Sequence, residues 1–497
     1  MKMMLRTVII LLTSSTNLYA ASFDDPACSE NPDTVVATIK IDAAKVLRKN
    51  VPPSLFGFDL PWADFQDGHF RSGKVRKETI AWLKPFAGAI YRFTGGNKYE
   101  WQKGVGTIEE RSKMKNHYSA TGYTFPFFGL AEYAKFLQQV DGNGIVVLNM
   151  MGPDGSYSEE PEMVANNIAM IDWMKDNSGL GCVAGGSCRI KYWELGNELD
   201  LEENWTANQY ATRAKALTSA LNEKYPGIRT LASGYSAPWD EPSMADQFNY
   251  SVAGEVADSV SGVTMHAYYD GYSVPSMLSW LNRTVTPYRQ INSTANMVIT
   301  EHGRWPSQTH ENWADDWYKA SGSIGAISTA DFIISIAKVP YISVAAWHAL
   351  GVSGPWKLFH YSVPTNQVYP SAVYWALRTL REGLLTSRIA VTPEKLISDF
   401  AYGYGINLLA MKNADGEVSL VGINRSATPV LATLSVENSN ASEEKSISYN
   451  YFTADEVGSD NTENDREKFT MQTRTVVTSD SLPEKVCIFP RSVFSVR

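Results

Sequence analysis

The chain has 497 residues, of which 44% are hydrophobic and 20% charged, and its formal net charge at neutral pH is −9. This composition excludes a disordered or collagen-like chain, and the length predicts two or three folded domains. The acidic balance argues against a nucleic-acid partner, because binding to a phosphate backbone needs a basic face.

The first twenty residues have the pattern of a secretory signal peptide. Lys2 and Arg6 form the charged end, Val8–Leu12 is a short apolar run, and Leu18-Tyr19-Ala20 is a suitable cleavage sequence. The apolar run is too short to span a bilayer. We therefore expect residues 1–20 to be a removable signal, and the protein to be secreted or periplasmic with no membrane span.

Four cysteines are compatible with disulfides in an exported protein. Cys182 and Cys188 flank the loop Val-Ala-Gly-Gly-Ser, and a bond between them would close it locally. Cys28 and Cys487 would then tie the two ends of the chain together. Free buried thiols are the alternative.

Residues 53–383 alternate short apolar runs with longer amphipathic segments, the pattern of repeated strand–helix units. After the fourth strand, Thr206 and Gln209 form a capping box, and Tyr225-Pro226-Gly227 ends the helix. Eight parallel strands covered by helices predict a catalytic (β/α)8 TIM barrel, an α/β fold whose active site lies at the C-terminal ends of the strands. The predicted strands lie near Leu55–Leu60, Ala87–Phe93, Ile145–Met150, Ile190–Leu195, Thr230–Ser233, Val260–His266, Met297–Thr300 and Ile342–Trp347.

Residues 384–497 have a different texture, in which short β-rich runs alternate with turns such as Asp415-Gly416. They predict a C-terminal antiparallel β-sandwich domain. Residues 21–52 contain one further strand, Val35–Ile41, which we expect to join that sandwich. The acidic stretch Asp455–Glu467 is expected to be a solvated loop.

Two carboxylates and an amide stand on the fourth predicted strand, within Tyr192–Leu199. Glu194 lies inside the strand, and we expect it to be a structural residue paired with an arginine or a hydroxyl. Asn197 and Glu198 stand where the strand opens into the site, so a functional role is favoured for them. The seventh strand also ends in a carboxylate, Glu301.

Two glutamates at the ends of opposed barrel strands favour glycoside hydrolysis. A retaining glycosidase needs one carboxyl group to protonate the leaving oxygen and another, about 5–5.5 Å away, to attack the anomeric carbon. We predict Glu198 as the general acid and base, and Glu301 as the nucleophile. The sequence has no metal-ligand spacing, phosphate-binding loop or Ser-His-Asp signature, so neither a metal nor a cofactor is predicted.

These motifs resemble glycoside hydrolase clan A, whose members are retaining TIM-barrel enzymes, and within it family 51, the α-L-arabinofuranosidases. The likeness is carried by Tyr91–Asn97, Tyr192–Asp200 and His266–Tyr269, and it covers roughly the first two-thirds of the barrel. It fades at Glu301-His302-Gly303, where the family usually has Glu-Trp-Asn. Families 39 and 79 of the clan, which act on xylosides and glucuronides among others, therefore stay open.

Six further residues are predicted to bind the substrate or position the glutamates: Arg92, Asn97, Asn197, His266, Tyr268 and Trp347. Arg92 is expected either to keep Glu301 charged or to pair with Glu194. Asn197 is expected to hydrogen-bond the sugar 2-hydroxyl, and either His266 or Tyr268 to orient Glu301. By resemblance Trp347 is a platform for the sugar ring, and core packing is the alternative.

Three functions fit these residues. The main prediction is a secreted retaining glycoside hydrolase with a carbohydrate substrate. The first possibility is an exo-acting, α-L-arabinofuranosidase-like enzyme. The alternative is another enzyme of the same clan, either endo-acting or a β-glycosidase, that acts on xylan, glucuronides or marine polysaccharide. The others are a barrel lyase or isomerase that uses the same glutamates, and a non-catalytic carbohydrate-binding barrel. The sugar, the linkage, endo or exo action and the oligomeric state depend on loops and surfaces that the sequence does not reveal.

Overall fold

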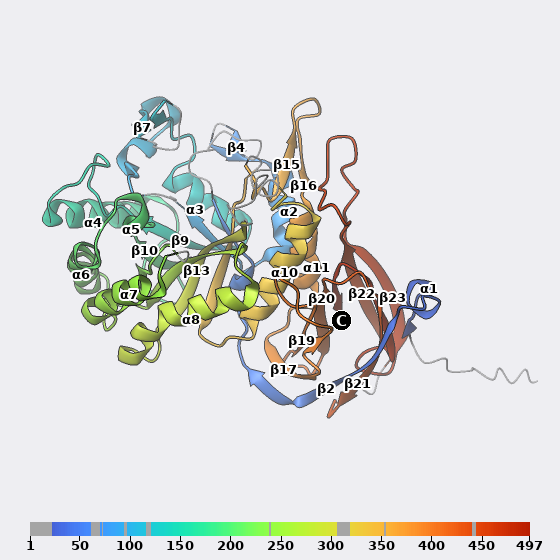
Figure 1. The fold of residues 1–497 in the computed structure, drawn as a ribbon. Coiled ribbons are helices and arrows are strands. Elements are labelled where there is room, and N and C mark those ends of the chain that lie inside the picture. The colour runs from blue at the N-terminus through green and yellow to red at the C-terminus, as the bar shows by residue number, and fades with distance from the viewer. Residues whose placement is uncertain are drawn as a thin grey trace, which may run out of the picture.

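The computed structural model describes residues 22–60, 70–71, 73–93, 97–115, 121–237, 240–305, 319–351, 354–439 and 444–497. The predicted signal peptide, residues 1–20, lies outside the described residues. A helix-covered barrel and a large β-sheet domain lie side by side (Figure 1). Within the described ranges, no helix is both long and apolar enough to cross a membrane.

Eight parallel strands close the barrel, and their order round it follows the chain. They are β3 (Gly57–Asp59), β6 (Ile90–Phe93), β9 (Asn143–Leu148), β10 (Ile190–Leu195), β11 (Thr230–Ser233), β12 (Gly262–Asp270), β13 (Asn296–Trp305) and β14 (Ile342–His348). Most of their residues are buried, because one face of each strand lines the barrel interior and the other packs against helices. Each strand lies where the apolar runs predicted it, so the TIM-barrel prediction is confirmed.

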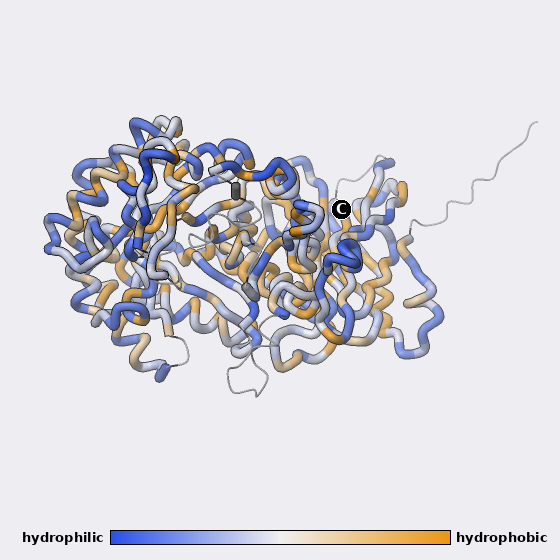
Figure 2. The backbone as a smooth tube through the Cα atoms, turned by 90° about the horizontal axis from the view of Figure 1, so that it is seen from above, coloured by the Kyte–Doolittle hydropathy of each residue, from blue (hydrophilic) through white to orange (hydrophobic). Residues whose placement is uncertain are grey.

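Helices pack round the outside of the barrel (Figure 1). The longer ones are α2 (Lys77–Leu83), α3 (Leu130–Gln139), α4 (Glu160–Asn177), α6 (Ala207–Lys224), α7 (Pro242–Val256), α8 (Val274–Ile291), α10 (Ser323–Ala337) and α11 (Ala372–Gly383). Hydrophobic and hydrophilic segments alternate along many of them in Figure 2, as expected of helices with one face on the barrel. The predicted capping box opens α6: the Thr206 N–H donates to the Gln209 side chain at 2.9 Å, and the Gln209 N–H to the Thr206 hydroxyl at 3.3 Å.

Three short hairpins among the described residues follow barrel strands and so lie on the side of their C-terminal ends. They are β4 (Phe70–Arg71) with β5 (Lys74–Val75), β7 (Met114–Lys115) with β8 (Tyr123–Thr124), and β15 (Phe359–Ser362) with β16 (Gln367–Pro370). The short helix α5 (Leu199–Glu202) begins directly after Glu198.

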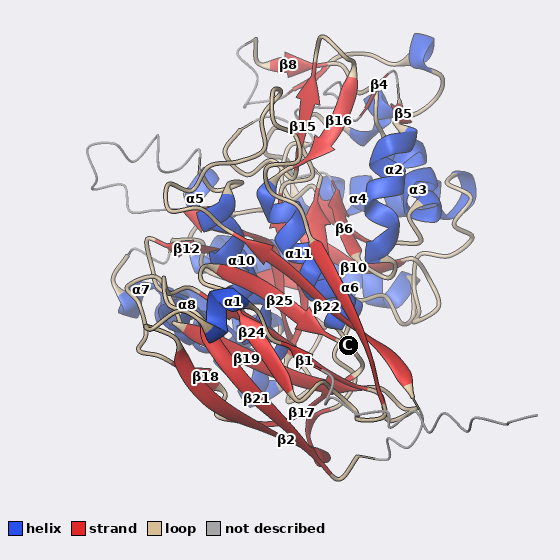
Figure 3. Ribbon diagram, turned by 90° about the vertical axis from the view of Figure 1, so that its right-hand side faces the viewer, coloured by secondary structure: helices blue, strands red, loops and turns tan. Residues whose placement is uncertain are grey.

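The second domain is a single hydrogen-bonded sheet, which faces the viewer in Figure 3. Its strands are β1 (Ser22–Phe23), β2 (Val35–Arg48), β17 (Ser387–Thr392), β18 (Lys395–Leu396), β19 (Ile406–Lys412), β20 (Val418–Asn424), β21 (Val430–Glu437), β22 (Lys445–Thr453), β23 (Gln472–Thr478), β24 (Lys485–Ile488) and β25 (Ser492–Val496). Their pairing is antiparallel, except that β2 runs parallel to β21 and β1 parallel to β24. One core contains Ile39, Leu408, Tyr449 and Phe494, which come from strands far apart in the sheet. The sheet therefore curls into two packed layers, the architecture of a sandwich.

The loop between β22 and β23 connects the sheet domain to the barrel helices. Asp455 accepts a hydrogen bond from the Ser323 hydroxyl at the start of α10, at 2.9 Å, and Asp460 accepts one from the Ala372 N–H at the start of α11, at 2.7 Å. A helix N-terminus favours a carboxylate, because its first N–H groups have no partner within the helix. The expectation of a merely solvated loop over Asp455–Glu467 is therefore wrong for these two residues.

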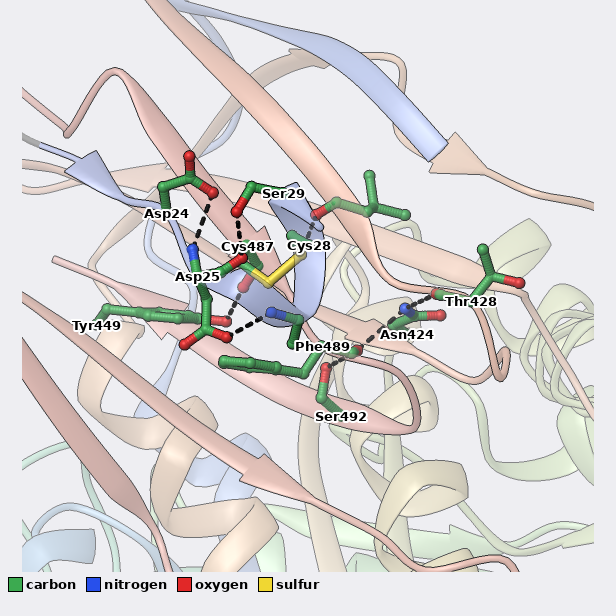
Figure 4. Close-up of a disulfide and its surroundings, with 12 residues drawn as sticks. Asp24, Asp25, Cys28, Ser29, Asn424, Thr428, Tyr449, Cys487, Phe489 and Ser492 are labelled. Atoms are coloured by element: carbon green, nitrogen blue, oxygen red, sulfur yellow. Dashed lines mark hydrogen bonds between the residues drawn. A yellow bond between two sulfur atoms is a disulfide. The ribbon is translucent and has the colours of Figure 1, made fainter. Parts of the chain in front are cut away.

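Both predicted disulfides are present, Cys28–Cys487 and Cys182–Cys188. Figure 4 shows the first, which joins the short helix α1 (Pro26–Ser29) to β24. The Tyr449 hydroxyl donates to the carbonyl of Cys487 at 2.6 Å. The bond thus attaches the N-terminal segment to β24, which neighbours β21 in the sheet.

We expect loss of the Cys28–Cys487 bond to destabilise the protein more than loss of the Cys182–Cys188 bond. The sequence separation is 459 for the first and 6 for the second, and closing a longer loop lowers the entropy of the unfolded chain more. The double variant Cys28→Ala/Cys487→Ala should lose about 2–5 kcal/mol of stability. Cys182→Ala/Cys188→Ala is the matched control. Thermal unfolding measures both, and equal losses would contradict the expectation.

Candidate active site

Glu198 and Glu301 meet at the C-terminal ends of β10 and β13. The Oε1 atom of Glu198 lies 2.6 Å from Nδ1 of His266, and the Oε2 atom of Glu301 lies 3.4 Å from the same nitrogen. Because both oxygens lie on one nitrogen, their separation cannot exceed the sum of these two distances. The barrel therefore brings together the two carboxylates that the sequence singled out.

The backbone at Glu198 has an unusual conformation. Its φ of 42° and ψ of 40° are left-handed, a region that costs a non-glycine residue about 1–3 kcal/mol and is often found at functional sites. Asn97 holds the turn, since its Oδ1 accepts from the Asn197 N–H at 2.7 Å and its Nδ2 donates to the Asn197 carbonyl. Asn97 is fully buried, so in this structure it supports the turn that carries Glu198, whereas the sequence predicted a substrate contact.

Arg92, at the end of β6, is fully buried and connects three acidic residues of the site. Its Nε donates to Glu194 at 2.6 Å, and its Nη1 donates to Glu301 at 2.8 Å and to Asp59 at 3.3 Å. Its Nη2 donates to Oδ1 of Asn197 at 2.6 Å. The two partners proposed as alternatives for Arg92, Glu301 and Glu194, are thus bound at the same time.

Glu194 and Asn197 are both held by neighbours. Glu194 accepts a second hydrogen bond from the Thr300 hydroxyl at 3.0 Å, which makes it the paired interior residue that the sequence predicted. The Nδ2 of Asn197 donates to Glu202 at 3.3 Å, a long bond, while Arg92 occupies its oxygen. The side-chain amide of Asn197 is therefore fixed in orientation.

Glu301 lies among positive charges. Burial would raise the pKa of its carboxyl group, but the charges of His266, His348 and Arg92 and a hydrogen bond from the Tyr268 hydroxyl at 2.6 Å hold that pKa far below its ordinary value. Glu301 is therefore ionised at neutral pH. Of the two residues predicted to orient it, Tyr268 is hydrogen-bonded to it, whereas His266 lies closer to Glu198.

The pKa of Glu198 shifts in the opposite direction. Its side chain is 21% exposed. Desolvation nevertheless raises the pKa of its carboxyl group, and the charge of His266 opposes this shift only in part. Burial would lower the pKa of His266, but the charges of Glu301 and Glu198 raise it to about 9. The pKa values of the two glutamates are thus driven apart, as in pairs where one residue is the acid and the other the base or nucleophile.

Two residues that the sequence analysis did not select complete the site. His348 ends β14, and its Nδ1 lies 2.8 Å from Oδ2 of Asp59, at the end of β3, and 3.7 Å from Oε2 of Glu301. The signal that selected Glu198 and Glu301, a polar residue at the C-terminal end of an apolar strand, is also present at Asp59 and His348. No family motif marked these two positions.

Asp59, Glu301 and His348 each offer one ligand atom, and these atoms lie within 4.8 Å of one another. Oxygen and imidazole ligands of this kind suit several divalent cations. However, Arg92 already donates to both carboxylates and supplies a positive charge between them. We therefore assign no metal to these residues.

Trp347 differs from the predicted sugar platform. Its side chain is fully buried, packs edge-on against His302, and donates from Nε1 to the Trp356 carbonyl at 3.2 Å. The reason is that successive side chains of a strand point to opposite faces. Val344 packs in a cluster with residues of other barrel strands, on the face that lines the barrel interior. His348, four residues on, lies on the same face, and Trp347 lies on the opposite face, toward the helices. In this structure Trp347 is a core residue.

The departure from the family motif, at His302-Gly303, lies within the barrel strand β13. Burial lowers the pKa of His302 to about 3, so its ring is neutral where it packs against Phe332 of α10. A side chain at Gly303 would put its Cβ 2.7 Å from the Trp356 ring. Gly303 thus lets Trp356 approach Tyr268, with ring centroids 5.2 Å apart, next to the nucleophile candidate.

Residues 82–270 match the family model described as the alpha-L-arabinofuranosidase 1 domain. No curated protein matches the chain. Among solved structures, the alpha-L-arabinofuranosidase of Thermotoga maritima in complex with arabinose has a TM-score of 0.72 at 16% identity, over 92% of this chain and 99% of that one. The GH51 alpha-L-arabinofuranosidase of Thermotoga petrophila gives a TM-score of 0.73 at the same identity and coverage of both chains.

A family 44 xyloglucanase from Paenibacillus polymyxa is also similar, with a TM-score of 0.59 at 12% identity, over 93% of this chain and 99% of that one. At such identities the structural likeness shows the shared fold, a barrel with a sheet domain. The family model adds a sequence match that runs from α2 to the end of β12. The chain is a glycoside hydrolase that resembles clan A and, within that clan, the α-L-arabinofuranosidases of family 51.

Proposed function

We propose that the protein is a retaining, exo-acting glycosidase of the α-L-arabinofuranosidase type that works by double displacement. The observation that carries this proposal is that Glu198 and Glu301 share His266 Nδ1, at 2.6 and 3.4 Å, while their pKa values shift in opposite directions. Because both carboxylate oxygens lie next to the same nitrogen, the distance between them is at most the sum of these two distances. That sum is smaller than the roughly 6.5–9.5 Å that inverting enzymes keep between their carboxyl groups to admit water.

In the first step, ionised Glu301 attacks the anomeric carbon while Glu198 gives its proton to the departing oxygen, which leaves a glycosyl ester on Glu301. In the second step, Glu198 takes a proton from a water molecule, and the water oxygen attacks the same carbon. The bond to Glu301 breaks with its electron pair on the carboxylate. Two inversions release the sugar with its original configuration.

The neighbouring residues support these two steps. Arg92 and Tyr268 each donate to a different oxygen of Glu301, which fixes the plane of the carboxylate. Asn197, oriented by Arg92, presents its amide for the sugar 2-hydroxyl, a contact that strengthens in the transition state. We assign the apolar side of the sugar site to Trp356, which packs on Tyr268, in place of the buried Trp347.

We also propose that residues 53–383 form the catalytic barrel, that residues 384–497 form the sandwich, and that residues 21–52 belong to the sandwich. The pairing of β2 with β17 and β21 supports the last point. Residues 1–20 would direct export, and two disulfides are compatible with an oxidising compartment.

Nitrophenyl glycosides of α-L-arabinofuranose, β-xylose and β-glucuronic acid test the proposal, with NMR of the first sugar anomer released. We expect the arabinofuranoside to be cleaved fastest, with retained configuration. An inverted product would contradict double displacement, and an unsaturated product would indicate a lyase. Saturable binding without any turnover would identify a non-catalytic carbohydrate-binding barrel.

A further inference from the structure

We propose that His348, held in place by Asp59, is a positioning residue that sets the charge of Glu301 independently of Glu198. The inference rests on the proposed roles of the two glutamates. It assigns a separate histidine to the nucleophile, in addition to the histidine that both glutamates share.

The geometry of Asp59 gives His348 its position. Oδ2 of Asp59 lies 2.8 Å from Nδ1 of His348, and Oδ1 accepts from Arg92 at 3.3 Å. The same carboxylate thus holds two cationic side chains that both face Glu301. The His348 ring packs edge-on against Trp356, with centroids 5.3 Å apart, which limits its rotation.

The titratable groups that face His348 come from three strands. They are Asp59 on β3, Glu301 and His302 on β13, and His266 and Tyr268 on β12. Burial would lower the pKa of His348 and His266 opposes a second charge, but the negative charges of Glu301 and Asp59 outweigh both and raise that pKa. His348 therefore keeps its proton at pH values where an exposed imidazole would lose it.

The two histidines differ in what they touch. His266 forms ion pairs with both Glu198 and Glu301. His348 forms its ion pairs, among the residues that the structure describes, with Asp59 and Glu301. Removing the charge of His348 should therefore change the pKa of Glu301 with little effect on that of Glu198. The positive charge of His348 also stabilises the carboxylate form of Glu301. This carboxylate is the leaving group when water cleaves the glycosyl ester.

The sign of the expected pH effect follows from the ionisation of Glu301. The enzyme is active while Glu301 is ionised, and activity falls as the pH drops through the pKa of this residue. His348 holds that pKa low. The neutral variant His348→Gln should therefore raise it and move the acidic limb of the pH profile to higher pH. The alkaline limb, where Glu198 loses its proton, should stay in place.

The test is kcat/KM as a function of pH for an aryl arabinofuranoside. We expect the acidic limb of His348→Gln to move upward by about 1–3 pH units, the effect of losing one opposite charge at this distance. The matched control is His360→Gln, which removes another histidine beside a carboxylate, 3.0 Å from Asp460 and outside the site. Its profile should equal that of the wild type. A uniform loss of rate without a shift in His348→Gln, or a shift of both limbs, would overturn the proposal.

A second readout needs no turnover. NMR titration of the full chain, with the His348 signal identified by its absence in His348→Gln, should give an imidazole pKa above the ordinary value of about 6.5. This pKa should fall in Glu301→Gln and in Asp59→Asn, provided that circular dichroism shows both variants folded. A pKa at or below the ordinary value would refute the role of His348. If no glycoside is cleaved but the pKa is raised and falls in both variants, the proposed function fails and the interaction of His348 with Asp59 and Glu301 stands.

Discussion

Glu301→Ala is expected to lose nearly all activity on every substrate, by a factor on the order of 10⁶, the scale seen when a covalent nucleophile is removed. Without the carboxylate no glycosyl ester can form. Glu198→Ala should behave differently, because it keeps the nucleophile and loses only the proton donor. Substrates with poor leaving groups should then lose about 10²–10⁴-fold in rate, and substrates with good leaving groups much less. A series of aryl glycosides with leaving groups of different pKa measures this contrast.

Azide sharpens the assignment of the two glutamates. As an anion it needs no general base, so it should restore turnover of activated substrates by Glu198→Ala and give a glycosyl azide of retained configuration. In Glu301→Ala any azide product must come from direct displacement, which inverts the configuration. Equal losses on activated and unactivated substrates, with no rescue of Glu198→Ala, would show that the roles of Glu198 and Glu301 are wrongly assigned.

Arg92→Met is expected to lower the free energy of unfolding by about 3–5 kcal/mol, the usual cost of removing one partner of a buried ion pair. The apolar side chain fills much of the same volume but leaves Asp59, Glu194 and Glu301 without the cation to which all three are bonded. Activity should fall as well, because the hydrogen bond from Arg92 to Glu301 is lost. Chemical and thermal unfolding of the variant measure the effect.

The matched control for this prediction is Arg283→Met. Arg283 pairs with Asp246 at 2.7 Å, and the two side chains are 35% and 42% exposed. Water and salt screen such a pair, so its loss should cost no more than about 1 kcal/mol. Similar destabilisation of the two variants would mean that the charges around Arg92 are compensated in another way.

The sequence alone determined the parts of the structure that depend on nearby residues. Apolar runs of strand length predicted all eight barrel strands, because a strand buried on both faces needs a continuous apolar segment. Thr206 and Gln209 predicted the start of α6, since a capping box is made within one helical turn. Glu198 and Glu301 could be selected from the sequence because each follows an apolar run, and parallel strands place such positions at one end of a barrel.

Only the tertiary structure decided the contacts between distant segments. Asp59 and His348, 289 residues apart, meet because barrel closure pairs β14 with β3. Trp347 turned out to be a core residue, because the face on which a strand residue lies depends on the register of the whole barrel and not on the residue type. Likewise, Asp460 binds the start of α11 only because the sheet domain packs beside the barrel. Local patterns follow from backbone geometry within a few residues, whereas these contacts exist only after the chain has closed the barrel and docked the sheet.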